Sequence, residues 1–554
     1  MTARPTLSER LRYRAAVAYD LWNWQRVLST LRCAERPPAQ RTVLFCNLLT
    51  MLSTAKVESL MAGVLRLKGF HPVILLERPQ WAIEKIFRAA AADAEFIYLD
   101  SWTDRARMEA AGESADAILA RSASFEDLMR LEIDGYRIGR NVQSLVLRQL
   151  RVGRLDNNDP RHHVAVKATL TRSLAAKEFV ENLMKERAPD VAIFIERGYT
   201  PAGEIFDGCL LHGVDAVQWC SAPQSDCLIY RRYRRNTRGE HPLALSDATW
   251  RGLMAIPWTE ENDRAVVERI AANYASGSWY NRQQLQEGKA IVERARVRDL
   301  LELDPLKKTA IVFCHILYDA TFFYGESLFE DYQHWLVETV RAAIGNPRLN
   351  WIVKVHPVNV WRSRMDGAKM VQLEAEALRE AHGKLPSHVK LMGADTPINT
   401  FSLFDVADYG LTVRGTIGME LPCFGIPVVT AGTGRYSGRG FTVDPATRRE
   451  YIELLGRLHE LPRLDADAVR RARRHYYGAL SLRPIPMRSF VLDYYPPARF
   501  GLPQHQDVYL KRRADESLLD TEDLGRFAHW IASTQEPELL ARSIEPAMQA
   551  AALS

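Results

Sequence analysis

Residues that suit phosphate chemistry follow short apolar runs in the second half of the chain. His356 and Pro357 come directly after the run 351–355, and Thr416 lies in a small-residue turn. A histidine that follows a strand can donate a hydrogen bond to phosphate, and Pro357 stiffens the turn behind it. We expect Thr416 and the backbone amides of 415–418 at a helix N-terminus, where unpaired N–H groups favour an anion. The sequence therefore predicts a site for the phosphates of a nucleotide.

The elements needed to position these residues are buried strands alternating with helices. That pattern indicates a parallel sheet covered on both faces, and ligands of such sheets sit outside the carboxyl ends of the strands. His356, Thr412, Thr416 and the glycine-rich loop 432–440 all fall at such ends, so we expect them to meet in one crevice. In the alternative interpretation His356 only caps a strand and the glycines only form turns.

Two carboxylates are candidates for the general base. Glu196 ends the strand predicted over 190–196, and Asp319 follows the strand predicted to end near His315. A carboxylate at a strand end that faces an interdomain cleft can remove a proton from an acceptor. The alternative for Glu196 is an ion pair with Arg197 that fixes a loop.

The densest basic run is 229–242, in which arginines alternate with tyrosines. Guanidinium groups suit phosphate and carboxylate groups. We therefore predict a docking surface for an acidic glycan, a lipid-linked phosphate or the anionic inner membrane surface. The alternative is a solvated basic face. The acceptor or anion candidates are Arg197, Arg231, Arg232 and Arg435.

Length and composition limit the class of protein. The 554 residues predict two or more domains, and 47% hydrophobic with 25% charged residues is ordinary for a globular protein. The net charge of +5 is too small to indicate nucleic acid as a partner. The seven cysteines are scattered and form no CxxC pair, which argues against disulfides and structural zinc and for the cytoplasm. No stretch reaches the roughly 20 apolar residues of a membrane span, and the N-terminus does not look like a secretory signal.

Along the chain, three strand patterns at 42–49, 71–77 and 95–100 alternate with helical patterns, which indicates a doubly wound domain. The stretch 105–187 is expected to be a helical insertion. We divide the chain into an N-terminal helical segment (1–40), a first Rossmann-like domain for the acceptor (41–225), a helical connection (226–305), a second Rossmann-like domain for the donor (306–500) and C-terminal helices (501–554).

The pieces KVHP, TVRGTIGMELPCFGIPVVTAGTGRYSGRGFT and FCHILYDATFFYG resemble the C-terminal half of bacterial capsular-polysaccharide-type glycosyltransferases. The likeness covers about 308–451. It implies a GT-B-like α/β fold, with two doubly wound Rossmann-like domains facing a cleft and, here, helical insertions. The His-Pro pair is similar to that of Kdo transferases and bacterial sialyltransferases, where it contacts the phosphate of a CMP-sugar. Teichoic-acid glycerophosphotransferases carry a similar pair.

The resemblance also implies roles for single residues. The loop after His315 is expected to line the donor site, Asp395 and Thr396 to lie near the nucleotide base, and Glu420 to hold the ribose hydroxyls. The acidic-acidic-Gly motif of sialyltransferase-like enzymes is here Glu196-Arg197-Gly198, which departs from the pattern in its second place. The complete set of predicted donor contacts is His315, Lys354, His356, Pro357, Asp395, Thr396, Arg414, Gly415, Thr416 and Glu420.

The prediction is a metal-independent glycosyltransferase that uses a nucleotide-sugar as co-substrate, without a resident cofactor, and acts on a glycan or lipid-linked glycan. A CMP-linked acidic sugar is the first donor and a UDP-sugar the second. We expect a cytoplasmic protein, with peripheral contact at the inner membrane as an option. One alternative is a CDP-alditol phosphotransferase of teichoic-acid type. The other is a non-catalytic scaffold of a polysaccharide export or synthesis complex.

Overall fold

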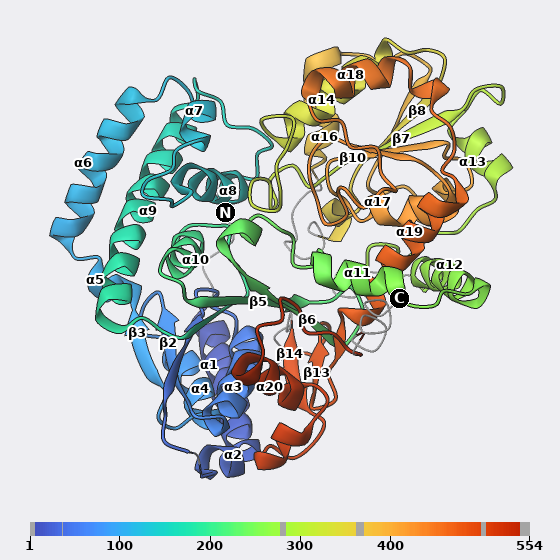
Figure 1. The fold of residues 1–554 in the computed structure, drawn as a ribbon. Coiled ribbons are helices and arrows are strands. Elements are labelled where there is room, and N and C mark those ends of the chain that lie inside the picture. The colour runs from blue at the N-terminus through green and yellow to red at the C-terminus, as the bar shows by residue number, and fades with distance from the viewer. Residues whose placement is uncertain are drawn as a thin grey trace.

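The computed structural model describes residues 6–35, 37–276, 284–361, 371–499, 506–542 and 544. Within these ranges the chain forms two main α/β sheets, each flanked by helices (Figure 1). The N-terminal sheet has seven strands and the C-terminal sheet five. The fold is the expected one: two doubly wound, Rossmann-like units that face each other, as in GT-B proteins.

The N-terminal sheet has the order β12-β6-β5-β4-β1-β2-β3, in which β3, β2, β1, β4 and β5 are parallel and β6 and β12 are antiparallel additions at one edge. The chain leaves β1 toward β2 on one side and returns to β4 on the other. This reversal makes the crevice beyond β1 and β4 a site at which ligands bind in open α/β sheets. Its strands are β1 (Arg41–Cys46), β2 (Phe70–Leu76), β3 (Glu95–Tyr98), β4 (Val191–Phe194), β5 (Asp215–Ser221), β6 (Cys227–Tyr233) and β12 (Ile485–Pro486).

The C-terminal sheet is parallel throughout, with the order β11-β10-β7-β8-β9. Every residue of β7 and β8 is buried, as a sheet covered on both faces requires. The strand order reverses between β7 and β10, so the loops after these two strands form the second crevice. The strands are β7 (Thr309–Phe313), β8 (Asn350–Lys354), β9 (Val389–Met392), β10 (Tyr409–Thr412) and β11 (Val428–Thr430).

The helices pack on both faces of the two sheets. Helices α6 to α9 make up the helical insertion expected over 105–187, and they stand together beside the N-terminal sheet (Figure 1). The helices are α1 (Leu7–Val27), α2 (Ser29–Cys33), α3 (Leu52–Leu67), α4 (Trp81–Ala90), α5 (Leu99–Trp102), α6 (Arg105–Arg121), α7 (Phe125–Met129), α8 (Ile138–Leu150), α9 (Pro160–Arg187), α10 (Ala202–Leu211), α11 (Asp247–Ala255), α12 (Glu260–Ala275), α13 (Arg294–Leu300), α14 (Tyr332–Ile344), α16 (Leu373–His382), α17 (Ile417–Glu420), α18 (Arg448–Gly456), α19 (Ala466–Tyr477) and α20 (Leu524–Ser533).

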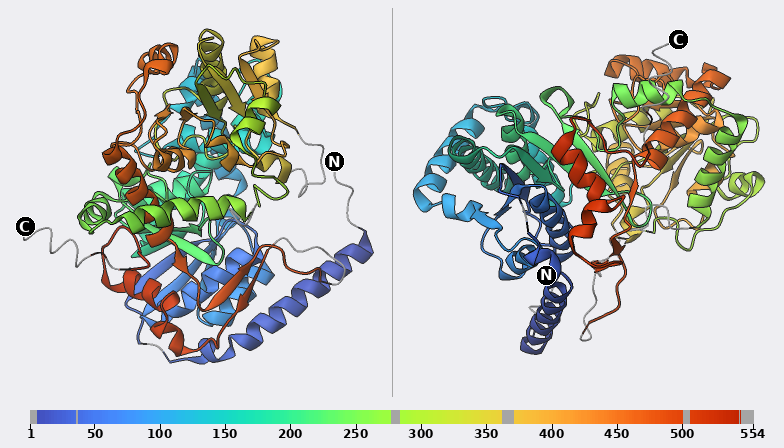
Figure 2. Two further views of the ribbon diagram at one scale, coloured as in Figure 1. Left: turned by 90° about the vertical axis from the view of Figure 1, so that its right-hand side faces the viewer. Right: turned by 60° about the horizontal axis from the view of Figure 1, so that its bottom comes forward.

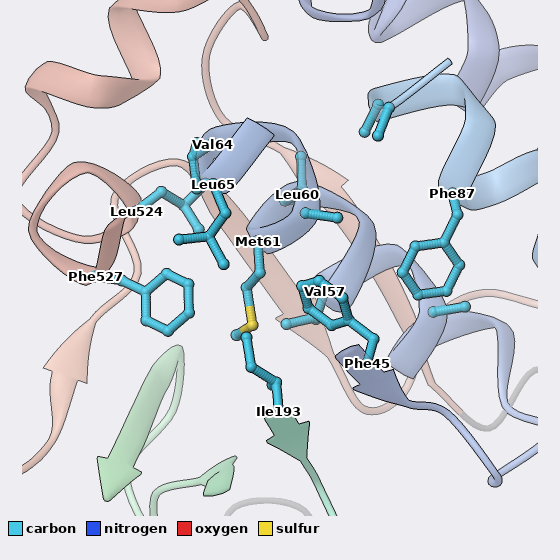
Figure 3. Packing of buried hydrophobic residues seen from close by; sticks show 14 of the residues in the cluster. Phe45, Val57, Leu60, Met61, Val64, Leu65, Phe87, Ile193, Leu524 and Phe527 are labelled. Atoms are coloured by element: carbon cyan, nitrogen blue, oxygen red, sulfur yellow. The ribbon is translucent and has the colours of Figure 1, made fainter. Parts of the chain in front are cut away.

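The end of the chain returns to the N-terminal unit. Strands β13 (Phe490–Asp493) and β14 (Asp507–Leu510) form a small antiparallel sheet, and α20 packs against α3. Figure 3 shows this contact: Leu524 and Phe527 of α20 face Met61 and Leu65 of α3 in the largest apolar cluster. The return explains how residues far apart in sequence share one core.

The unit boundaries therefore differ from the expected ranges in two places. The segment 226–305 was expected to be a helical connection, but it begins with β6, which pairs with β5. The range 306–500 was expected to form the donor domain, but β12 and β13 near its end join the N-terminal unit. β6 joins the sheet through a hairpin with β5, whereas β12 joins it by pairing with a strand about 250 residues earlier, which local sequence patterns do not encode.

No helix in the described part of the chain is long and apolar enough to span a membrane. All seven cysteines are free.

Candidate functional site

A cavity of about 600 Å³ lies at the carboxyl ends of both sheets. Residues of both units form its walls, so it is the interdomain cleft that the strand order predicts. The predicted site residues that line it are Glu196, His315, Asp319, Lys354, His356, Pro357, Arg414, Gly415, Thr416, Glu420 and Arg435.

Lys354, the last residue of β8, places a cation in the cavity wall. It is 4% exposed, and no hydrogen bond or ion pair joins its ammonium to the described residues. Burial, and after it the charge of the neighbouring Lys289, lowers the pKa of Lys354 to about 7. A buried cation without a partner is costly, so an anion in the cavity would bring Lys354 the opposite charge that it lacks.

His356 lies two residues farther along and is half-buried at the same wall. Its Nδ1 accepts a hydrogen bond from the backbone N–H of Val358 at 3.2 Å. In the neutral ring the proton therefore sits on Nε2. This tautomer makes Nε2 a hydrogen-bond donor, as contact with a phosphate oxygen requires.

His315 organises the turn after β10. Its Nε2 accepts from the backbone N–H groups of Val413 and Arg414 at 3.2 and 3.3 Å and lies 3.1 Å from the Thr412 hydroxyl oxygen. The ring stacks on Tyr332 with centroids 4.3 Å apart. Burial and the nearby Arg414 lower the pKa of His315 well below its ordinary value, so the ring stays neutral and joins the loops after β7 and β10.

The segment after Thr416 differs from the expected helix. The α-helix α17 covers only Ile417–Glu420 and continues as a 3₁₀ turn over Leu421–Phe424, with Pro422 inside it. A helix this short gives little dipole. Thr416 does stand at the N-terminus of this short helix, as expected, and the anion site at its backbone amides stays a prediction.

Glu420 and Tyr274 form another part of the wall. The Tyr274 hydroxyl donates to Glu420 Oε2 at 2.7 Å, and Glu420 is fully buried. Both residues line the cavity. Asp395 and Thr396, expected near the nucleotide base, lie outside the described lining of the cavity, because the loop after β9 ends beside Gln372 and Lys289. This position does not support the base-binding role predicted for them.

The two base candidates contact two neighbouring residues of the N-terminal unit: Arg148 contacts Glu196, and Tyr199 contacts Asp319. Arg148 of α8 lies 3.3 Å from Glu196 Oε2, and its guanidinium stands 4.6 Å from the centre of the Tyr199 ring. The Tyr199 hydroxyl donates to Asp319 Oδ1 at 2.8 Å and accepts from the Ala320 N–H at 3.0 Å. Burial and the charge of Asp319 raise the pKa of Tyr199 well above its ordinary value. Glu196 and Asp319 therefore lie on the same side of the cavity, one from each unit.

A glycine permits this close approach of the two units. A Cβ atom on Gly198 would lie 2.0 Å from Cγ of Phe323. The Phe323 ring also packs edge-on against Tyr199, with centroids 5.0 Å apart. Gly198, the position at which this chain keeps the glycine of the acidic-acidic-Gly motif, is thus needed for the packing between the two units.

Three predicted anion contacts are structural instead. Arg197, Arg231 and Arg232 are at most 2% exposed. Arg197 donates to Gln218 and to two backbone carbonyls, while Arg232 holds both oxygens of Asp215 at 2.8 Å. Arg231 is paired with Glu240 and lies 3.6 Å from Glu538. Because these side chains are buried and paired within the protein, the prediction of an acceptor surface at these residues is wrong.

Sequence patterns did not single out several residues of the cleft. Arg148 lies on a helix of the insertion and Tyr274 belongs to α12, and both line the cavity. Tyr199 follows a strand end and donates to Asp319, which lines the cavity. Arg148 and Tyr274 reach the cavity only through tertiary packing. Tyr199 could have been found, because it follows Glu196 by three residues at the end of β4.

No family model and no curated protein matches the chain. Among solved structures, the beta Kdo 2,4 transferase KpsC of Thermosulfurimonas dismutans is 16% identical, with a TM-score of 0.31 over 57% of this chain and 84% of that one. A UDP-N-acetylglucosamine 2-epimerase is 12% identical (TM-score 0.24, 80% and 94% covered), and Anabaena Alr3699/HepE with UDP and glucose is 10% identical (0.24, 80% and 95%). The assignment of the fold rests on the sheet topology described above.

Proposed function

We propose that this protein is a glycosyltransferase that binds a nucleotide-sugar against the C-terminal unit and transfers the sugar to an acceptor held by the N-terminal unit. The observation that carries the proposal is the pairing of opposite chemistries across one cavity. Lys354 and His356 offer positive charge and a hydrogen-bond donor on one wall, and Glu196 and Asp319 offer carboxylates on another. Phosphate departure and hydroxyl activation need these two kinds of group.

The donor we propose first is a CMP-linked acidic sugar, and a UDP-sugar is second. The His-Pro pair at 356–357 supports this order, since it is similar to the pair that contacts the phosphate of CMP-sugars. The acceptor we propose is a glycan or a lipid-linked glycan of a surface polysaccharide. The seven free cysteines fit a reducing compartment, so we propose that the reaction takes place in the cytoplasm.

In the proposed mechanism an acceptor hydroxyl attacks the anomeric carbon. The new bond joins that carbon to the acceptor oxygen, and the bond to the phosphate oxygen breaks. Glu196 or Asp319 takes the hydroxyl proton, and the nucleotide leaves with the bonding electron pair, stabilised by Lys354 and His356. Arg148 holds Glu196 in place.

The two base candidates can be separated by Glu196→Gln and Asp319→Asn, each of which keeps the side-chain shape. Loss of a general base lowers kcat by about 10²–10⁴. We expect one variant to show that loss with nucleotide affinity unchanged, and the other to show a smaller effect. Equal kcat in both variants and the wild type would remove both carboxylates from the mechanism.

The first test of the proposal is calorimetric titration with CMP, CDP, UDP and GDP. We expect one of the cytidine or uridine nucleotides to bind, and His356→Ala to weaken it by about tenfold or more, because a hydrogen bond to a charged group is lost. His382→Ala is the matched control, since His382 bonds a helix carbonyl and lies outside the described cavity lining.

The outcomes separate the alternatives. CMP binding that depends on His356 supports the CMP-sugar donor, and UDP binding redirects the search to UDP-sugars. CDP binding with transfer of a phosphoalditol instead of a sugar would identify the phosphotransferase. Absence of binding by all four nucleotides would contradict the proposal and favour the scaffold.

A further inference from the structure

We propose that the outer face of α1, together with the adjacent face of α4, docks on a bilayer of anionic phospholipids. This inference is independent of the proposed function, because it concerns a surface of the N-terminal unit away from the cleft. Figure 2 shows α1 along the edge of this unit, with its N-terminal half projecting beyond the neighbouring elements.

Helix α1 has two apolar faces. The inner face packs in the core through Val17, Leu21 and Trp24, which are at most 6% exposed. The outer face carries Leu7, Leu11, Ala15, Ala18 and Trp22, all exposed. Successive spacings of four, four, three and four residues place these outer residues in one stripe along the helix.

The exposed fractions show that this stripe is uncovered. Leu7 is 73%, Leu11 58% and Trp22 59% exposed, and Tyr19 beside them is 52% exposed. Single exposed apolar residues are common, but an aligned set marks an interaction site.

The charges beside the stripe are positive. Arg10, Arg12, Arg14 and Arg26 are exposed on α1, whereas Asp20 is buried and bonded to Lys56 at 2.7 Å. Arg26 stands 5.6 Å from the centre of the Trp22 ring. Arginines flanking leucine and tryptophan are typical of helices that lie in the interface of an anionic membrane.

The neighbouring helix α4 extends the same surface chemistry. It packs against α1 and exposes Trp81, Lys85 and Arg88, which share one helix face at spacings of four and three residues. The ammonium of Lys85 lies 5.4 Å from the centre of the Trp81 ring. Tryptophan prefers the level of the lipid headgroups, so each helix pairs an indole with a cation that can meet a lipid phosphate.

A lipid surface fits these features better than the other occupants. A second copy of α1 across the stripe would bring arginines against arginines, which repel one another. A nucleic acid would satisfy the arginines but leave Leu7 and Leu11 in water. A bilayer with anionic headgroups accommodates both, because it offers negative charge outside and hydrocarbon beneath. The basic run 229–242, where a membrane contact was expected, has Arg231 and Arg232 buried.

Co-sedimentation with vesicles tests the proposal. We expect the protein to bind vesicles of mixed phosphatidylcholine and phosphatidylglycerol, and to bind vesicles of phosphatidylcholine alone much more weakly. The variant R10Q/R12Q/R14Q should lose about fivefold in affinity for each arginine, the equivalent of about 1 kcal/mol. The variant L11S/W22S should lose about tenfold or more through the apolar contact.

The matched control is R341Q/R449Q/R470Q, which removes the same charge from exposed side chains of the C-terminal unit. It should bind anionic vesicles like the wild type, and thermal melting should show all three variants folded. Absence of vesicle binding by the wild type, or an equal loss in the control, would overturn the proposal. So would light scattering that shows a dimer which L11S/W22S dissociates, since a second copy would then cover the stripe.

Discussion

Cationic side chains are buried in both units of this protein, and they differ in what neutralises them. In the N-terminal unit, Arg231 and Arg232 are covered and paired with carboxylates from other elements. In the C-terminal unit, Lys354 is equally covered, but no described carboxylate or carbonyl contacts its ammonium. The first arrangement stabilises a structure, while the second leaves a charge that an incoming anion can meet.

Whether a buried cationic side chain can bind an anion depends on whether the protein already neutralises its charge. The arginines of 229–242 have the composition of an anion-binding surface, but Arg231 and Arg232 are buried and paired with carboxylates of the protein. Lys354 is a single lysine at the end of a hydrophobic strand, and we propose it as the better anion contact because it lines the cavity.

Substitution of Arg231 by Met should destabilise the fold strongly. Arg231 contacts Glu240 and lies 3.6 Å from Glu538, whose side chain is 1% exposed. Breaking a buried pair by removing one partner costs about 3–5 kcal/mol, and Glu538 would then be left with Arg483, at 3.8 Å, as its ion-pair partner. Urea unfolding measures the loss.

The control for this prediction is Arg449→Met, at a side chain that is 85% exposed in a helix-surface ion pair. Its free energy of unfolding should change by about 0.5 kcal/mol or less. Similar unfolding curves for both variants would show that the buried arginine network contributes little to stability.

Substitution of Lys354 by Met should lower the affinity for nucleotide without destabilising the fold. The affinity for the bound nucleotide should fall by about 1.5–3 kcal/mol, the usual value for a hydrogen bond to a charged group. The free energy of unfolding should stay the same or rise at neutral pH. The reason is that the unfolded lysine holds its proton more tightly than the folded one, whose pKa is about 7.

Lys308→Met is the matched control for calorimetry and unfolding. Lys308 lies beside the opposite end of β7 and donates to the Tyr409 hydroxyl at 2.9 Å, so its loss should leave nucleotide affinity unchanged. If Lys354→Met unfolds the protein or binds nucleotide like the wild type, Lys354 is not the anion contact that its burial indicates.

Local patterns predicted much of the fold. The apolar run 351–355 overlaps β8, the stretch 42–49 overlaps β1, and the stretch 190–196 contains β4. Such strands are recognisable because both faces are buried, which makes their sequences continuously apolar. The strand order then placed His356 and Glu196 at carboxyl ends, and both line the cavity.

Contacts with residues far away in sequence were not predicted. Arg232, for example, donates a hydrogen bond to the backbone carbonyl of Glu536, which lies 304 positions away. Local capping patterns can mislead as well: Asp444 precedes Pro445 as an N-cap residue often does, but the N-cap of α18 is Thr447. Asp444 instead accepts bonds from the Thr430 hydroxyl and the Gly438 amide. A side chain with two possible partners cannot be assigned from the sequence beside it.

The dependence of nucleotide affinity on pH gives the finest distinction between the two arrangements. The pKa of Lys354 is lowered to about 7, chiefly by burial, so the free protein loses this charge as the pH rises above 7. A bound phosphate raises that pKa, because it favours the charged form. Binding above pH 7 must therefore take up a proton, and the affinity should fall by up to about tenfold for each pH unit between 7 and 9. Below pH 7 the lysine is already charged in the free protein, so it no longer makes the nucleotide affinity depend on pH. The fall in affinity between pH 7 and 9 should vanish in Lys354→Met and persist in Lys308→Met.

Calorimetry in two buffers with different ionisation enthalpies counts the protons that nucleotide binding takes up. Uptake near one proton at pH 8 in the wild type, and none in Lys354→Met, would assign the titrating group to this lysine. A wild-type affinity that is constant from pH 7 to 9 would mean that the nucleotide phosphate lies away from Lys354, and the anion site would then have to be sought nearer Arg435 on the opposite loop.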